Sequence, residues 1–219
     1  MNMGYSEQLC TVGSPATRAT EPNLANLELA FGDTAGVAIF GILKIKNGFY
    51  AFDNALHVFS DLGTDTEPGI YEWNGQSCWK SYYGRLAPPG VCFAEDAYGN
   101  QFCWLHGKIR LFNADTGLRN QRSWREIEII AESMEEWAEI ILQAPTLWTG
   151  QVVAQDWQKI HSVLRRGHRL LRQVPFQWQG ERSATNVESR PGVEAMRRMG
   201  EFAVSMLDGS SDTDTSITK

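Results

Sequence analysis

Glu95 and Asp96 are adjacent acidic residues that could carry acid–base chemistry. Paired carboxylates serve enzymes as general acid and general base when both reach the same substrate atom. Neighbouring side chains of a strand point to opposite faces, so these two converge only if a turn folds them together. Because Tyr98 and Gly99 follow after Ala97, the sequence favours a turn whose carboxylates accept backbone N–H groups.

His57 and the cysteines suggest two other kinds of chemistry. His57 lies in an apolar stretch, a position typical of a histidine that is hydrogen-bonded in the core. Cys103 and His106 form a single Cys-x-x-His with Cys92 some distance before it, which lacks the doubled short spacing of a zinc site. We therefore expect no catalytic residue, no metal and no cofactor. A small enzyme that uses Glu95 or His57 is the alternative of a different class.

A basic cluster with interleaved leucines follows later in the chain. It consists of Arg165, Arg166, His168, Arg169 and Arg172. This pattern is typical of a solvated rim over core positions, or of salt-bridge partners for the Glu-rich segment of residues 126–139. Phosphate or RNA binding is the competing interpretation. It is disfavoured because there is no glycine-rich phosphate cradle and no exposed-aromatic signature of an RNA-binding module.

Length and composition indicate one soluble domain. A chain of 219 residues buries roughly 70% of its unfolded surface on folding. No apolar run reaches the roughly 20 residues that cross a bilayer, and the first residues lack a secretory pattern, so we expect a cytoplasmic protein that binds no membrane. Four cysteines are too few for a disulfide scaffold and are expected to be reduced and mostly buried.

Charge is unevenly distributed along the chain. The net charge of −6 argues against general nucleic-acid binding. Residues 121–148 hold two Arg against six Glu, whereas residues 149–207 hold nine Lys and Arg against five Asp and Glu. Eight Trp, ten Phe and six Tyr supply the core and, where exposed, an interface.

The central part of the sequence predicts short strands joined by tight turns. Alternating side chains predict a meander of three strands within residues 91–111, and a hairpin is predicted at residues 49–59 around Asp53-Asn54. Residues 34–46 have helical spacing and end at Asn47-Gly48, with a buried strand as the competing interpretation. Residues 70–73 are expected to form a strand, and residues 77–83 a short helix.

The C-terminal part predicts helices. Ser133 and Glu136 form a capping box that begins a helix, which Pro145 stops. Further helices are expected at residues 152–164 and 194–207, with an extended segment at 170–176. Residues 1–30 are expected to be a flexible arm and residues 208–219 a disordered tail, so that the folded domain spans 31–207 with a C-terminal extension from about residue 149.

Several phrases, taken in their order along the chain, resemble the SUKH superfamily. The resemblance covers about residues 35–148, and later phrases resemble the C-terminal part of a bacterial subset of that group. The phrases are Asn47 through Phe59, Tyr71 through Asn74, Trp79 through Gly84, Phe93 through Asp96, Gly99 through Phe102, Asp115 through Gly117, Glu136 through Ala138, Thr149-Gly150, Asp156 through Gln158, Arg169 through Leu171 and Val174 through Phe176.

This resemblance implies an α+β fold, with a central, mostly antiparallel sheet flanked by helices, and no enzymatic activity. It also implies an immunity protein that neutralises a cognate bacterial toxin, in many members a nuclease, by direct binding. A regulatory or scaffold protein that recognises a cellular partner is the alternative. Because they are expected in turns, Asp53, Glu95, Asp96 and Tyr98 are the residues we predict to contact the partner.

Overall fold

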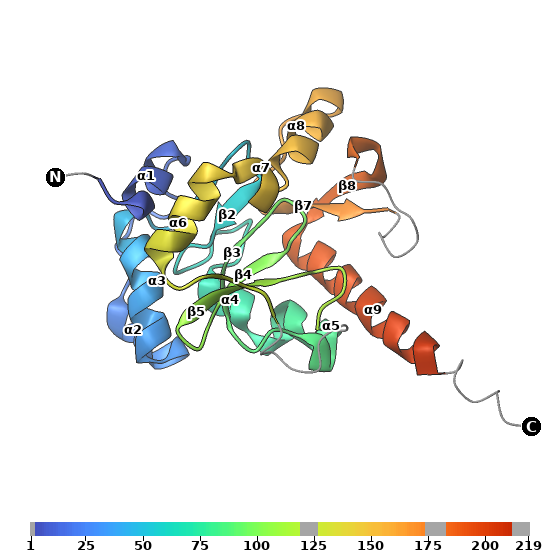
Figure 1. Ribbon diagram of the computed structural model, residues 1–219, viewed down its shortest axis with the longest axis horizontal. Helices are drawn as coiled ribbons and strands as arrows, with labels where there is room; N and C mark the ends of the chain where they lie inside the picture. Colours follow the sequence, from blue (N-terminus) through green and yellow to red (C-terminus); the bar gives the residue numbers. More distant parts are fainter. Residues whose placement is uncertain (1–2, 119–126, 174–182, 212–219) are drawn as a thin grey trace, which may run out of the picture.

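The chain folds as an α+β protein, and its described residues form two antiparallel sheets (Figure 1). The computed structural model describes residues 3–118, 127–173 and 183–211, with side chains up to Leu207. The larger sheet has the strands in sequence order: β1 (Phe49–Ala51), β2 (Leu56–Val58), β3 (Val91–Glu95), β4 (Gln101–Leu105), β5 (Lys108–Phe112) and β6 (Ile129–Ala131). The smaller sheet pairs β7 (His168–Arg172) with β8 (Val187–Pro191).

Helices cover both faces of the larger sheet (Figure 1). Before β3 the chain forms α1 (Tyr5–Val12), α2 (Leu24–Phe31), α3 (Asp33–Ile45), α4 (Ile70–Asn74), the π-helical η1 (Gln76–Lys80), α5 (Ser81–Tyr83) and the 3-10 turn η2 (Gly84–Leu86). After β6 it forms α6 (Met134–Gln143), α7 (Pro145–Trp148), α8 (Gln151–Ile160), the 3-10 turn η5 (Ala184–Asn186) and the long α9 (Gly192–Ser211).

Aromatic side chains mark the two faces of the sheet. Phe93 and Phe102 meet the ring of Trp137 from α6 edge-on, at centroid distances of 4.9 and 5.5 Å. On the opposite face, the ring of Phe112 lies 6.0 Å from that of Trp79 in η1 and 5.3 Å from that of Tyr83 in α5. The core is therefore two aromatic layers with the sheet between them.

The predicted hairpin and meander are confirmed. β1 pairs with β2 through Phe49↔Val58, and the three residues 52–54 of the turn all have left-handed φ angles, 53°, 59° and 62°. Asp and Asn tolerate this conformation better than other side chains, which is why the Asp53-Asn54 dipeptide indicated the turn. The helix predicted at 34–46 is α3, so the competing strand interpretation is wrong.

Two expectations for local structure are wrong. Residues 1–30 are not a flexible arm over the part described, because α1 and α2 bury Leu9, Cys10 and Leu27 in the core. Residues 70–73 form the helix α4 rather than a strand, because the Glu72 carboxylate accepts the backbone N–H of Gly69 at 3.0 Å and caps a helical turn.

The C-terminal helices were predicted with shifted ends. Ser133 accepts the N–H of Glu136 at 3.2 Å as expected, but the Glu136 carboxylate reaches the N–H of Glu132 instead of that of Ser133. α6 ends at Gln143, and Pro145 begins α7, where its missing N–H costs nothing. α8 stops at Ile160, and the buried Leu164 follows it in a loop.

The extended segment predicted at 170–176 is β7 as far as Arg172; Gln173 lies in a bend, and the rest lies outside the described residues. The last helix, α9, runs to Ser211, four residues into the tail predicted to be disordered; residues 212–219 lie outside the described part. Within the described residues, no helix has both the length and the apolar character needed to cross a membrane.

Candidate functional site

A row of polar side chains crosses four strands of the larger sheet on one face. Tyr50 is the Cα partner of His57, His57 of Glu95, and Glu95 of Gln101. All four are buried, with exposures between 0% and 2%. Side chains directly opposite each other on one face lie close enough to interact, so the register alone brings these residues together.

Hydrogen bonds connect this polar row. The Glu95 carboxylate accepts from His57 Nδ1 at 3.1 Å and from Gln101 Nε2 at 3.1 Å. The Gln101 carbonyl oxygen in turn accepts the indole N–H of Trp73 at 2.7 Å, and Tyr50 stacks on the imidazole of His57 with ring centroids 4.2 Å apart. The predicted role of His57 as a hydrogen-bonded core residue is confirmed.

Two charged residues from outside the row complete the network. Arg169 of β7 is fully buried, and its Nη2 lies 2.6 Å from Glu95 Oε1 as an ion pair, although its angles are poor for a hydrogen bond. Glu67, from the loop before α4, accepts the hydroxyl of Tyr50 and lies 3.8 Å from His57 Nε2. Burial of so many polar groups is tolerated because Glu95 faces the opposite charge of Arg169 and the carboxylate of Glu67 accepts a hydrogen bond from Tyr50.

Burial and pairing set the ionisation of the network. Burial lowers the pKa of His57 and outweighs the opposing effect of the hydrogen bond that His57 donates to Glu95, so the imidazole stays neutral near neutral pH. Burial alone would raise the pKa of Glu95, but the Arg169 guanidinium and the His57 hydrogen bond outweigh it and hold that pKa below its usual value. A hollow of about 50 Å³ beside these groups is large enough only for water.

Two arginines of the basic cluster form buried ion pairs. Arg169 pairs with Glu95, and Arg172 pairs with the buried Asp115, which follows β5. The guanidinium of Arg172 also lies 4.2 Å from the ring centroid of Tyr98. Of the two interpretations of this cluster, a solvated rim or salt-bridge partners, the first does not hold for Arg169, which is fully buried, and the carboxylates that pair with Arg169 and Arg172 lie outside residues 126–139.

Asp96 organises the turn between β3 and β4, as expected from the sequence. Its Oδ1 accepts the N–H groups of Tyr98 and Asn100 at 2.8 and 2.9 Å, and its Oδ2 accepts from Asn100 Nδ2 at 2.7 Å. Burial raises the pKa of Asp96 to about 7, although these three hydrogen bonds favour the ionised carboxylate and lower that pKa. Glu95 faces the polar row while Asp96 caps its own turn, so the two carboxylates do not converge.

The residues predicted to contact a partner differ in exposure. Asp53 is exposed, and its carboxylate accepts from the side-chain amides of Gln151 and Gln155 of α8, at 3.1 and 2.7 Å. Glu95, Asp96 and Tyr98 are only 2%, 5% and 9% exposed. We chose these residues because we expected them in turns rather than at core positions. That reason is wrong for Glu95, which belongs to β3; Asp96 and Tyr98 do lie in the turn after it, but the turn is covered.

A groove of about 640 Å³ lies where the β3–β4 turn meets α7 and α8. Asp96, Tyr98 and Arg172 contribute its polar lining, and Leu147 and Val152 contribute exposed apolar side chains at 73% and 50% exposure. This volume is within the range of about 300–1,000 Å³ that is typical of ligand sites. Sequence reasoning missed the groove because its walls come from five separate segments of the chain.

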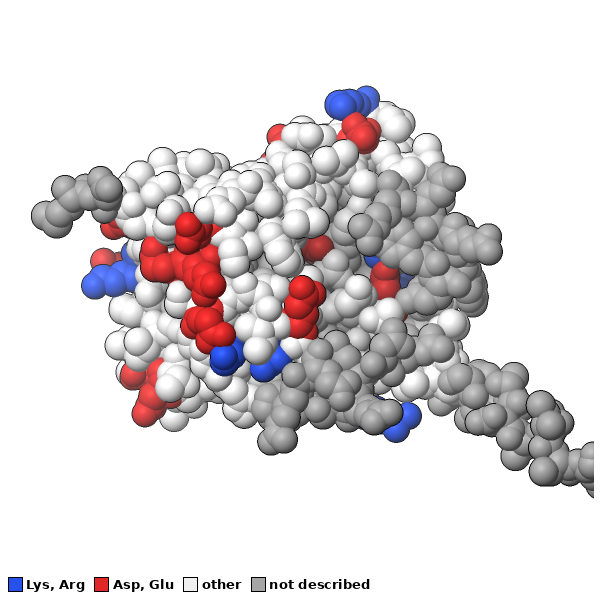
Figure 2. All heavy atoms as spheres, in the orientation of Figure 1, with Lys and Arg blue, Asp and Glu red and all other residues white. Residues whose placement is uncertain are grey.

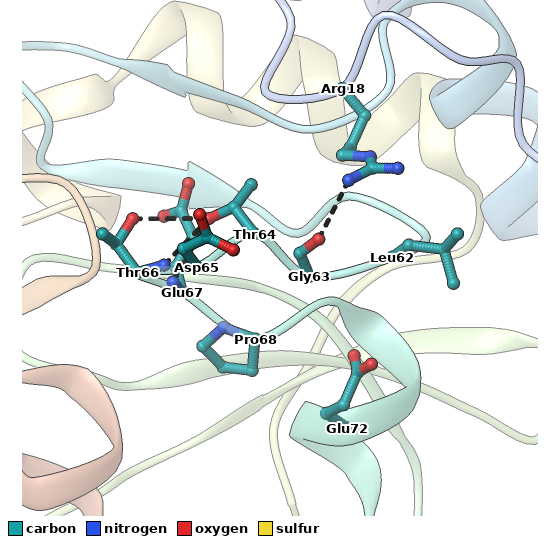
Figure 3. Close-up of a pocket in the computed structure, with 9 residues that line it drawn as sticks. All are labelled: Arg18, Leu62, Gly63, Thr64, Asp65, Thr66, Glu67, Pro68 and Glu72. Carbon is teal, nitrogen blue, oxygen red and sulfur yellow. Dashed lines mark hydrogen bonds between the residues drawn. The ribbon is translucent and has the colours of Figure 1, made fainter.

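A second hollow of about 590 Å³ lies over the loop before α4 (Figure 3). Its polar groups stabilise the loop itself: Arg18 donates to the carbonyl of Gly63 at 3.1 Å, and the hydroxyls of Thr64 and Thr66 lie 3.3 Å apart. Arg18 and Glu72 enter the hollow from opposite sides, so its charged groups do not converge on one point (Figure 3).

Acidic side chains gather on the face that carries α6 (Figure 2). The exposed or half-buried members of this acidic surface are Glu7, Glu128, Glu132, Glu135, Glu136 and Glu139. Glu132 forms an exposed pair with Lys108 at 2.7 Å, and Glu128 also lines the groove. The neighbouring Ile129 is 44% exposed. Acidic and apolar groups thus meet at the rim of the groove, and the Glu-rich segment was the sequence signal for this surface.

The described residues contain no group of three or more His, Cys, Asp or Glu side chains arranged to hold a metal ion. Comparison with known proteins found no matching family model and no matching curated protein. Among solved structures, the chain resembles the crystal structure of Atu4351 from Agrobacterium tumefaciens, with a TM-score of 0.55 and 11% sequence identity over 90% of this chain and 88% of that chain. At this identity the likeness concerns the α+β fold alone.

Proposed function

We propose that this protein is a non-enzymatic binding protein of the immunity type, which neutralises a cognate bacterial toxin by direct contact. The observation that carries the proposal is the acidic surface around α6 and the two ends of β6, which continues into a groove with exposed apolar side chains. A basic toxin, such as a nuclease with a positively charged active site, has the complementary charge.

Each part of this surface has a role in binding. Acidic residues attract a basic partner over a distance and so raise the association rate. The exposed Leu147 and Val152 offer apolar area that becomes buried in a complex, and the groove can receive a protruding side chain. The sheet and the aromatic layers behind the surface keep it rigid, which lowers the entropy lost on binding.

The internal engagement of the candidate catalytic groups also favours binding over catalysis. The carboxylates of Glu95 and Asp96 and the ring of His57 already have partners within the protein. A general base needs a free position toward its substrate, and none of these three groups is accessible.

Co-expression with the product of the adjacent reading frame tests the proposal. We expect that product to be toxic alone and harmless in the presence of this protein. If it is harmless alone, or equally toxic with this protein present, the immunity function is excluded. A neighbour that is not toxic but binds would favour the regulatory or scaffold alternative.

Charge reversal tests the surface. We expect the double variant Glu128→Lys/Glu132→Lys to weaken toxin binding by about tenfold or more, because each reversal places like charges in contact. Asp65→Lys/Glu201→Lys is the matched control, since both residues are exposed, lie outside the acidic surface and change the net charge equally. Equal affinities of the two double variants would place the toxin elsewhere on the molecule.

A further inference from the structure

Cys92 and Cys103 lie opposite each other on neighbouring strands. They are Cα partners in the β3–β4 register, and their sulfur atoms are 3.0 Å apart. Both are free thiols, and their exposures are 0% and 2%. Since a disulfide bond is about 2.05 Å long, bonding requires the sulfurs to approach by about 1 Å.

The backbone geometry suits a cross-strand disulfide. Asn74 of α4 binds both backbone groups of Cys92, accepting its N–H at 2.8 Å and donating to its carbonyl at 2.8 Å. These groups therefore point away from β4, and the cysteines form a non-hydrogen-bonded pair. In such pairs the Cα atoms are about 4.5 Å apart, which is within the 4.4–6.8 Å found in disulfides.

The two sulfurs have different ionisation tendencies. Burial alone would raise the pKa of Cys92, but the hydrogen bond with Cys103 and the ammonium of Lys80 outweigh it and lower that pKa. Burial raises the pKa of Cys103 well above its usual value. Lys80 is held in place by Asn74 Oδ1 at 3.2 Å and the Gly90 carbonyl at 3.1 Å. Cys92 is therefore the better nucleophile of the pair.

We propose that Cys92 and Cys103 are an oxidation site, at which a small peroxide such as hydrogen peroxide converts two thiols into a cross-strand disulfide. The Cys92 thiolate attacks one peroxide oxygen, the O–O bond breaks, and the released hydroxide takes up a proton to become water. The sulfur of Cys103 then displaces hydroxide from the Cys92 sulfenic acid, and the thiol proton of Cys103 completes the second water. Peroxide is reduced, and two thiols lose two electrons and two protons.

The position of the pair determines how fast the reaction proceeds. Both sulfurs are covered, so peroxide reaches them only through local opening of the β3–β4 hairpin. The register of β3 shifts between Cys92 and Ala94, and such an irregularity weakens the ladder next to the pair. We expect the disulfide to form more slowly than the oxidation of the half-buried Cys78.

The test uses a full-length Cys10→Ser/Cys78→Ser variant, which retains only the proposed pair. After hydrogen peroxide treatment of the folded protein, we expect its mass to fall by that of two hydrogen atoms. After denaturation, no thiol should react with iodoacetamide. Dithiothreitol should reverse both changes. The same background with Cys103→Ala is the control, and it should gain oxygen atoms instead.

Persistent free thiols, stepwise oxygen addition to both sulfurs, or a disulfide between two molecules would each overturn the proposal. If the double serine variant does not fold, peptide mapping of the peroxide-treated wild-type protein gives the same decision. A cross-linked peptide pair containing Cys92 and Cys103 supports the site, and a different pairing, or none, excludes it.

Discussion

At the scale of single residues, two adjacent carboxylates have opposite surroundings. Glu95 faces a guanidinium and is held ionised, whereas Asp96 is buried in a turn where only neutral donors bind it directly. Strand geometry explains the divergence, because successive side chains leave the backbone in opposite directions. Sequence adjacency of acidic residues is therefore a weak indication of shared chemistry.

The raised pKa of Asp96 predicts a pH-dependent stability. Burial raises that pKa to about 7, whereas an aspartate in an unfolded chain titrates near about 3.9. Between these values the folded protein binds more protons than the unfolded chain, so the free energy of unfolding falls as pH rises from about 4 to about 7. Asp96→Asn keeps an acceptor oxygen for the turn and should remove this part of the pH dependence.

Urea unfolding at about pH 5 and about pH 8 measures this effect in both proteins. We expect the loss of stability between the two pH values to be smaller in Asp96→Asn than in the wild-type protein. Asp53→Asn is the matched control, since Asp53 is an exposed aspartate in another turn. An unchanged pH dependence in Asp96→Asn would show that the carboxylate is ionised throughout this range.

At the scale of elements, α1 is held at both ends by residues far away in the sequence. The Glu135 carboxylate accepts the N–H groups of Tyr5 and Ser6, at 2.8 and 3.2 Å, at the N-terminus of the helix. At the other end, Lys46 donates to the carbonyls of Cys10 and Ser14. A negative group at the N-terminus and a positive group at the C-terminus both stabilise the helix dipole.

Glu135→Ala should therefore loosen α1. We expect a loss of about 1 kcal/mol, the usual cost of removing a helix cap, and faster proteolysis near the N-terminus. Glu201→Ala is the control, because Glu201 is an exposed glutamate of another helix, α9, and its loss should cost less than about 0.5 kcal/mol. Equal losses in the two variants would contradict the capping role.

The predictable elements are those with local patterns. Alternating apolar residues identified the strands of the meander, and a 3.6-residue repeat identified α3. α1 was missed because its docking depends on Glu135 and Lys46, which no local pattern connects with it. The groove and the ion pair of Arg169 were missed for the same reason, since each joins segments whose proximity depends on strand register.

At the scale of the whole molecule, the polar row joins the two sheets. β7 contacts the larger sheet through the ion pair of Arg169 with Glu95 and through the Leu170 N–H, which donates to the Ala97 carbonyl at 2.7 Å. Thr149, at the entry to α8, accepts the N–H of Ala97 at 3.0 Å in the same turn. The smaller sheet, α8 and the β3–β4 turn are thus fixed together, and with them the walls of the groove.

Removing one partner of this ion pair should weaken the whole domain. Arg169→Met leaves the carboxylate of Glu95 buried without its counter-charge, for which we expect a loss of about 3–5 kcal/mol of unfolding free energy. The double variant Glu95→Gln/Arg169→Met removes both charges and keeps similar side-chain volumes. It should be more stable than Arg169→Met alone, because the unpaired charge is gone.

Urea unfolding of the wild-type protein, both single variants and the double variant gives the coupling energy directly. Arg190→Met, which breaks the solvent-accessible ion pair of Arg190 with Glu188 on strand β8, is the matched control and should lower stability far less than Arg169→Met. Additive losses from the two single substitutions would mean that Arg169 stabilises β7 by packing alone. A large coupling would mean that one buried charge pair holds the smaller sheet, and the groove beside it, in place.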